Sequence, residues 1–255
     1  MADFATEAGH WYQPDGTPLY EVPTAKGDKL RPTTLRDARK LGLYPSVTGI
    51  MKELAAPGLT VWKAKEAAKA AFYLSLQPNE TLDQYAMRAI KVVEDEVAKG
   101  AEEGSRIHAA LEQFFMGQPY ASDYWPIVES VDAYLETISD IDMWSTERSF
   151  ARHGFGGKVD LHQPGIVVDF KTKDFDESNL PKTYENHALQ LGAYREGLQL
   201  GDDAYGVIIF ISRTVRGLIH PLVLPPEELT KGYQMFGCLF NLWCIRRNYF
   251  PWESK

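Results

Sequence analysis

The chain has 255 residues, 44% of them hydrophobic, and a formal net charge of −8. It offers no apolar run long enough to span a membrane, so we expect one globular domain over residues 1–255 with no membrane partner. The first residues lack the basic and apolar regions of a secretory signal, and a cytoplasmic protein is expected. Cys238 and Cys244 are expected to be buried free thiols.

Residues 1–44 are rich in proline, glycine and aromatic residues, which predicts an irregular arm that packs on the body. Ser46 is a suitable N-cap for a helix that begins near Val47. Apolar periodicity predicts further helices over Leu59–Leu76, Thr81–Lys99, a segment after Gly100 and Gly104 that carries His108, and Pro126–Ile138.

Strands are expected after these helices. The predicted elements are a strand over Trp144–Arg152, a hairpin over Gly156–Lys171, a helix over Thr183–Leu200, a buried strand over Tyr205–Ile211, its partner over Leu218–Leu224, and a last helix from Pro226 to Arg247. This order predicts an α/β protein with a helical N-terminal part.

The hairpin carries the most informative chemistry. Polar and apolar residues alternate in its first strand, and Gln163-Pro164-Gly165 is a turn signal. Folding about this turn brings Asp160 opposite one of residues 167 to 169. Asp169 and Lys171 share a strand face because they are two residues apart. Two carboxylates beside one ammonium group favour a hard divalent metal ion.

Two other polar positions lie on predicted helices. His108 borders an apolar helical face, where a histidine is more often structural than a metal ligand. Gln190 and Tyr194 are four residues apart and therefore lie on one side of their helix. Taken singly, either feature has an ordinary structural explanation.

The order of the motifs is more specific than any one of them. Along the chain they are Gly104-x-x-x-His108, Gly157-x-x-Asp160, Asp169-x-Lys171 and Gln190-x-x-x-Tyr194. Over about residues 100 to 200, this series resembles the RecB-type branch of the PD-(D/E)XK nuclease superfamily. Residues 31–51 are more weakly similar to the N-terminal region of bacteriophage-encoded exonucleases in that branch.

The resemblance implies the restriction-endonuclease-like αβββαβ core, with a mixed central sheet and a large N-terminal helical addition. Residues 1–100 would form an arm and a helical cap, and residues 101–255 the catalytic core. In relatives that trim single strands, such helices arch over the active site, and residues 59–99 are the corresponding segment. A plain helical cap explains the same segment equally well.

The resemblance also assigns roles. His108, Asp160 and Asp169 would bind one or two Mg²⁺ or Mn²⁺ ions, with the backbone carbonyl of Phe170 as a further ligand. Lys171 would be the catalytic lysine, and Gln190 and Tyr194 would support the site and the nucleic acid. Glu103 or Glu112 could replace His108, and Lys173 is the rival of Lys171. Some relatives hold an iron–sulfur cluster on four cysteines, which two cysteines cannot supply.

Several basic residues could contact DNA phosphates, although solvated surface charges explain them as well. They are Lys173, Arg195, Arg213, Arg36 and Lys63. The net negative charge does not exclude DNA, because binding depends on local basic surfaces such as residues 26–40.

The resemblance therefore predicts a metal-dependent DNA exonuclease that acts on free ends, with single-stranded ends favoured if an arch is present. Recombination, replication or degradation of DNA in a phage-infected cell is the expected setting. The alternatives are an endonuclease of the same fold, a nuclease-fold DNA-binding protein without catalysis, and a metal-binding domain that acts on a small phosphoester.

Overall fold

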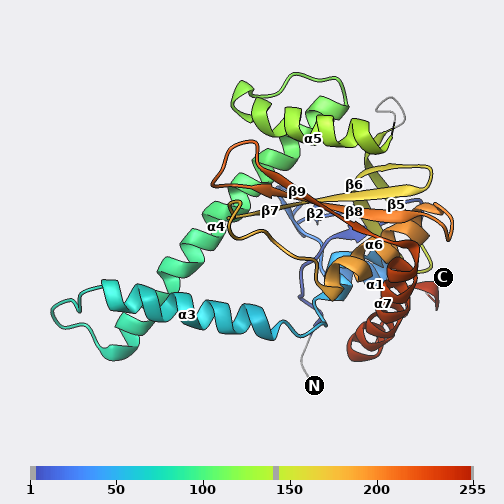
Figure 1. The fold of residues 1–255 in the computed structure, drawn as a ribbon. Helices are drawn as coiled ribbons and strands as arrows, with labels where there is room; N and C mark the ends of the chain where they lie inside the picture. The colour runs from blue at the N-terminus through green and yellow to red at the C-terminus, as the bar shows by residue number, and fades with distance from the viewer. Residues whose placement is uncertain (1–3, 140–143, 254–255) are drawn as a thin grey trace.

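The protein is a mixed α/β structure in which N-terminal helices precede a five-stranded sheet with flanking helices (Figure 1). The computed structural model describes residues 4–139 and 144–253. Within these ranges, no helix is both long and apolar enough to cross a membrane.

The central sheet has the strand order β5-β6-β7-β8-β9. Its strands are β5 (Ser145–Arg152), β6 (Phe155–Gln163), β7 (Ile166–Lys173), β8 (Tyr205–Ser212) and β9 (Ile219–Leu224). Only the β7–β8 pair is parallel among these neighbours, and helix α6 (Glu185–Leu198) connects the two strands. The sequence predicted each of these elements to within two residues, because alternation and turn signals are clear in this part of the chain.

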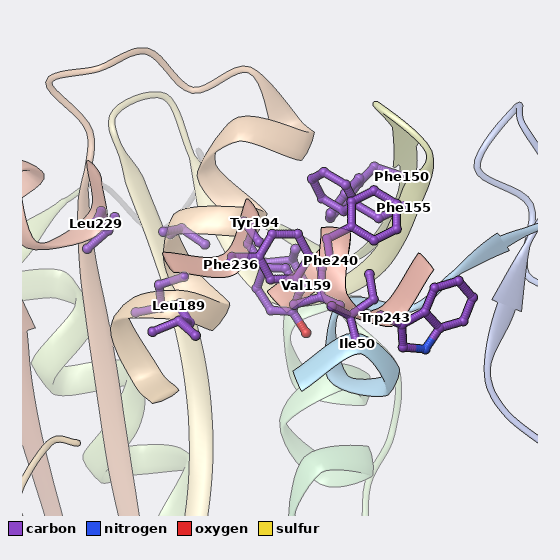
Figure 2. Close-up of a cluster of buried hydrophobic side chains, with 14 of the residues drawn as sticks. Ile50, Phe150, Phe155, Val159, Leu189, Tyr194, Leu229, Phe236, Phe240 and Trp243 are labelled. Atoms are coloured by element: carbon purple, nitrogen blue, oxygen red, sulfur yellow. The ribbon is translucent and has the colours of Figure 1, made fainter. Parts of the chain in front are cut away.

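Helices cover both faces of the sheet, and each face has its own apolar core. One core joins the sheet to α6 and α7 (Pro226–Arg247), and Figure 2 shows its Phe155, Phe236 and Phe240 packed together. The other core joins the sheet to α5 (Trp125–Ile138) and the last turns of α4 (Leu82–Phe115). The sheet is therefore the middle layer of three.

The N-terminal arm is more regular than the sequence indicated. It contains the short strands and helix β1 (Trp11–Tyr12), β2 (Glu21–Pro23), β3 (Leu30–Pro32), α1 (Leu35–Leu41) and β4 (Tyr44–Pro45), and α2 (Val47–Met51) follows with Ser46 as its N-cap, as predicted. The prediction of irregular structure was wrong because strands of two or three residues are too short to show a period. Two ion pairs from Arg247, to Glu7 and Glu53, tie the arm to the end of α7.

The segment predicted as two helices separated by a glycine turn is one helix. Helix α4 continues through Gly100 and Gly104 without a break, so the expected boundary at residue 100 lies inside an element. Gly104 is buried where α4 crosses β7, and a β-carbon there would come within 2.6 Å of Thr172 Oγ1. The glycine therefore allows a close approach and does not end the helix.

Helix α3 (Pro57–Tyr73) and the first half of α4 extend away from the sheet as a hairpin (Figure 1). None of the residues of α3 is buried. Two short 3₁₀ helices, Ser122–Tyr124 and Pro251–Glu253, are the remaining elements within residues 4–139 and 144–253. Cys244 is buried as expected, whereas Cys238 is exposed, because six residues place the two on different sides of α7.

Helices α6 and α7 touch at the backbone through glycine, which makes their spacing sensitive to a single methyl group. A β-carbon at Gly232 would lie 2.1 Å from the carbonyl oxygen of Ala188. We expect Gly232→Ala to lower the free energy of unfolding by about 1–3 kcal/mol, because the helices must separate. Chemical denaturation measures this change.

Gly237 on the same helix is the matched control, since a β-carbon there meets nothing within 4 Å. Gly237→Ala should raise the free energy of unfolding by about 0.5–1 kcal/mol through a lower backbone entropy cost. Equal effects of the two substitutions would contradict the close helix contact.

Candidate active site

The predicted carboxylates lie where strands β6 and β7 part. The paired register of the hairpin ends with Leu161 opposite Val168, and Asp160 and Asp169 are the next residues on each strand. Instead of a backbone pair, the Asp160 carboxylate accepts a hydrogen bond from the Phe170 N–H at 2.7 Å. The separation of the strands therefore leaves space for side-chain chemistry at this end of the hairpin.

Strand β6 also changes the direction of its side chains here. Val159 and Leu161 would share one face of a regular strand, yet they belong to different cores. On the neighbouring strand, Glu147 adopts a positive φ of 53°, which is uncommon for a residue other than glycine. The local twist at Asp160 explains how its carboxylate reaches the β7 backbone.

Two basic side chains, one imidazole and one ammonium group, lie next to these carboxylates. His108 Nδ1 lies 3.5 Å from one oxygen of Asp160, and Lys171 Nζ lies 2.6 Å from Asp169 Oδ2. The His108 ring also meets the edge of the Phe170 ring, with centroids 6.0 Å apart. Helix α4 and strand β7 thus bring the predicted residues into one cluster.

Helix α6 supplies the remaining predicted pair. The Gln190 carboxamide nitrogen donates to Asp169 Oδ1 at 2.9 Å and to the Tyr194 hydroxyl at 3.0 Å. All three side chains are buried. Gln190 therefore fixes the orientation of the Asp169 carboxylate, and Tyr194 fixes that of Gln190.

The two carboxylates have different electrostatic environments. Burial and the neighbouring Asp160 raise the pKa of Asp169 despite the opposing effect of Lys171. Burial would also raise the pKa of Asp160, but His108, the Phe170 N–H and Lys171 outweigh it and hold the pKa below its ordinary value. Asp160 is therefore the firmer anion of the pair.

The basic partners are stabilised in their charged forms. Burial lowers the pKa of Lys171, but the charges of Asp169 and Asp160 reverse this and raise it overall. The pKa of His108 is raised in the same way by Asp160, against the effect of burial. Burial raises the pKa of Tyr194 far above its usual range, so its hydroxyl remains a neutral hydrogen-bonding group.

The donor set suits Mg²⁺ or Mn²⁺, since it consists of two carboxylates and one imidazole. Asp169 Oδ2 is buried and makes no hydrogen bond of regular geometry within residues 4–139 and 144–253, although Lys171 is its ion-pair partner. Across the same residues, no three His, Cys, Asp or Glu side chains already form a metal cage. The types of donor atom therefore suit Mg²⁺ or Mn²⁺, and in the structure these side chains form hydrogen bonds and ion pairs within the cluster.

A cleft of about 620 Å³ borders this cluster. His108, Glu112 and Tyr194 contribute to its wall, and so do Glu147 and Lys158. Lys158 forms an ion pair with Glu147 and lies 4.0 Å from Glu112. The sequence did not single out Lys158, although its position between Gly157 and Asp160 in a strand could have indicated it.

The predicted phosphate-binding residues do not line this cleft. Lys173, Arg36 and Lys63 are exposed, and Arg213 forms an ion pair with Asp174 at 2.9 Å. The prediction for Arg195 was wrong. Its side chain is only 2% exposed, and it donates to the carbonyls of Asp202 and Pro226 and to Thr230. Sequence alone could not distinguish this buried arginine from a solvated one.

Comparisons with known proteins identify no family. No family model and no curated protein matches the chain. Among solved structures it is similar to one described as "Crystal structure of SSO0001", with 15% identity, a TM-score of 0.27, and coverage of 71% of this chain and 86% of that chain. At this TM-score the likeness carries no argument about function.

The position of Arg195 yields a test of stability. We expect Arg195→Ala to lower the free energy of unfolding by about 3 kcal/mol, because buried carbonyl groups lose their donor. The exposed Arg36 is the control, and Arg36→Ala should stay within about 0.5 kcal/mol of the wild type. Unchanged stability of Arg195→Ala in urea denaturation would contradict the structural role.

We expect His187 on α6 to make the stability of the protein depend on pH. Burial, together with the charges of Lys171 and Lys173, lowers its pKa to about 4. The folded state therefore favours neutral His187, so stability is complete above the ordinary pKa of about 6.5 and is lost as the pH falls toward 4. The loss should reach about 3 kcal/mol.

Denaturation curves between pH 7.5 and 4 for the wild type and His187→Gln measure this effect. The substitution should flatten the dependence on pH. Parallel curves for the wild type and His187→Gln would show that His187 is not responsible.

Proposed function

We propose that the protein is a metal-dependent DNA nuclease of the PD-(D/E)XK superfamily, RecB-type branch, and that it digests DNA exonucleolytically from free ends. One observation supports this proposal above all. The four sequence motifs come from α4, β6, β7 and α6, and their polar side chains form one contiguous cluster beside a cleft. Short motifs that occur by chance along a sequence are not expected to lie together in the folded protein.

The order of elements adds support. Helix α4, strands β5 to β7, helix α6 and strand β8 follow the αβββαβ order of the superfamily core, with α5 as an additional helix. The helical hairpin of α3 and α4 corresponds to the proposed cap or arch. We therefore interpret residues 1–255 as one nuclease domain with an N-terminal addition.

His108, Asp160 and Asp169 would hold Mg²⁺ or Mn²⁺, with the Phe170 carbonyl as a further ligand. When bound, the metal supplies Lewis acidity that polarises a phosphate and lowers the pKa of a water molecule. Burial raises the pKa of Asp169. A cation bound nearby would lower that pKa and so favour the ionised carboxylate.

The remaining residues act through position and charge. Lys171 stays protonated beside Asp169, and an ammonium group there can orient water or stabilise negative charge on a phosphate. The hydrogen bond that Gln190 donates to Asp169 limits the rotation of the Asp169 carboxylate. Tyr194, held by Gln190, reaches the wall of the cleft.

End-labelled linear DNA, single- and double-stranded, provides the test beside a closed circle, with Mg²⁺, Mn²⁺ or EDTA. We expect metal-dependent loss of linear DNA only, with the rate reduced about 100-fold or more in Lys171→Ala, because charge stabilisation is lost. Lys173→Ala, two residues further on the same strand and exposed, is the matched control and should digest DNA like the wild type.

Two of the alternatives have their own outcomes in this assay. Cleavage of the closed circle would replace the exonuclease with an endonuclease. Binding without cleavage under all metal conditions would leave a DNA-binding protein without catalysis. Equal rates for Lys171→Ala and the wild type would remove the proposed role of this lysine.

A further inference from the structure

The N-terminal arm supplies a wall of the same cleft. His10, Tyr12 and Tyr20 line it, facing a set of residues that includes His108 and Tyr194. The arm is fixed in this place by a parallel bridge between Ser46 and Gly156. A β-carbon at Gly156 would come within 2.6 Å of the Tyr12 ring, so this glycine admits the arm against β6.

Two of these rings form a stacked pair at the cleft. The His10 and Tyr20 rings lie 4.4 Å apart at an interplanar angle of 27°. Tyr12 supports the pair from the buried side, through a 2.8 Å hydrogen bond between its hydroxyl and that of Tyr20. His10 is exposed although it borders the cleft. The stacked pair is thus an aromatic surface whose position is fixed by the buried Tyr12.

His10 also separates the cleft from a second hollow of about 360 Å³. The two hollows share His10, Ser46 and Thr48 as lining residues. The second hollow is lined in addition by Trp11 and Lys52. A flexible chain that occupied both hollows would run along this shared border, to which the His10 ring belongs.

The lysines beside the cleft are already paired with carboxylates. Lys158 faces two carboxylates, Glu112 and Glu147, and Lys171 faces Asp169 and Asp160. No surplus of positive charge is therefore available among these groups for a polyanion. Aromatic stacking on bases supplies about 1–3 kcal/mol per base in addition to any contact with the phosphates.

We propose that the His10–Tyr20 pair is a stacking platform for an unpaired base of single-stranded DNA, on the path between the cleft and the second hollow. This inference rests on the proposed function and specifies its substrate class. A base inside a duplex already stacks on its neighbours, so the platform acts on a single strand or on an unpaired end.

Binding of oligonucleotides tests the platform, with Ca²⁺ in place of Mg²⁺. A single strand that contains 2-aminopurine reports stacking by loss of fluorescence, and an otherwise identical strand with abasic sites lacks the rings. We expect His10→Ala to bind the first strand about tenfold more weakly and to quench it less, and to bind the abasic strand like the wild type.

Two further variants separate stacking from structural damage. His10→Phe keeps a ring and should restore binding and quenching, whereas His153→Ala, at an exposed histidine that does not line the cleft, should leave both unchanged. Wild-type quenching and affinity in His10→Ala would overturn the platform. So would an equal loss of affinity for the abasic strand.

The cleavage assay keeps this inference distinct from the proposed function. DNA digestion by the wild type together with unaltered single-strand binding by His10→Ala would reject the platform and leave the nuclease intact. Absence of digestion by the wild type together with quenched binding would reject the nuclease and retain a single-strand-binding surface.

Discussion

The hydrogen bond from the Phe170 N–H to the Asp160 carboxylate is the contact on which the site depends. A continued backbone ladder would have closed β6 onto β7 and paired Asp160 directly with Asp169, leaving no space between the strands. With the side chain as acceptor, the strands part while the buried amide keeps a partner, as burial requires. The Asp160 carboxylate thus replaces a backbone carbonyl as the acceptor of the Phe170 N–H. This replacement creates the space in which the two carboxylates, His108 and Lys171 lie together.

The packing of α6 against α7 fixes the positions of the side chains that reach the gap between β6 and β7. Gln190 and Tyr194 reach the carboxylates from α6, and the position of α6 is set by its backbone contact with α7 at Gly232. Arg195, on the same helix, donates hydrogen bonds across this contact to Pro226 and Thr230 of α7. Residues without any chemical role therefore decide where the polar side chains of α6 point.

The sequence predicted the sheet well, and the side chains that it singled out lie together in the fold, because strand alternation and the spacing of Asp160, Asp169 and Lys171 are local properties. It failed where the structure depends on distant contacts. The buried environment of Arg195 comes in part from Pro226 and Thr230 of α7, and the continuity of α4 through Gly100 depends on packing that propensity cannot express. The contribution of His10 and Tyr20 to the cleft was hidden for the same reason.

The continuity of α4 makes His108 part of a long rigid rod. At 34 residues the helix is about 50 Å long, and one end lies in the projecting hairpin while the other packs on the sheet. Anything that tilts the hairpin must therefore bend a hydrogen-bonded helix or turn it about its crossing with β7 near Gly104. His108 lies one turn beyond that pivot, so motion of the hairpin and the position of the imidazole are mechanically coupled.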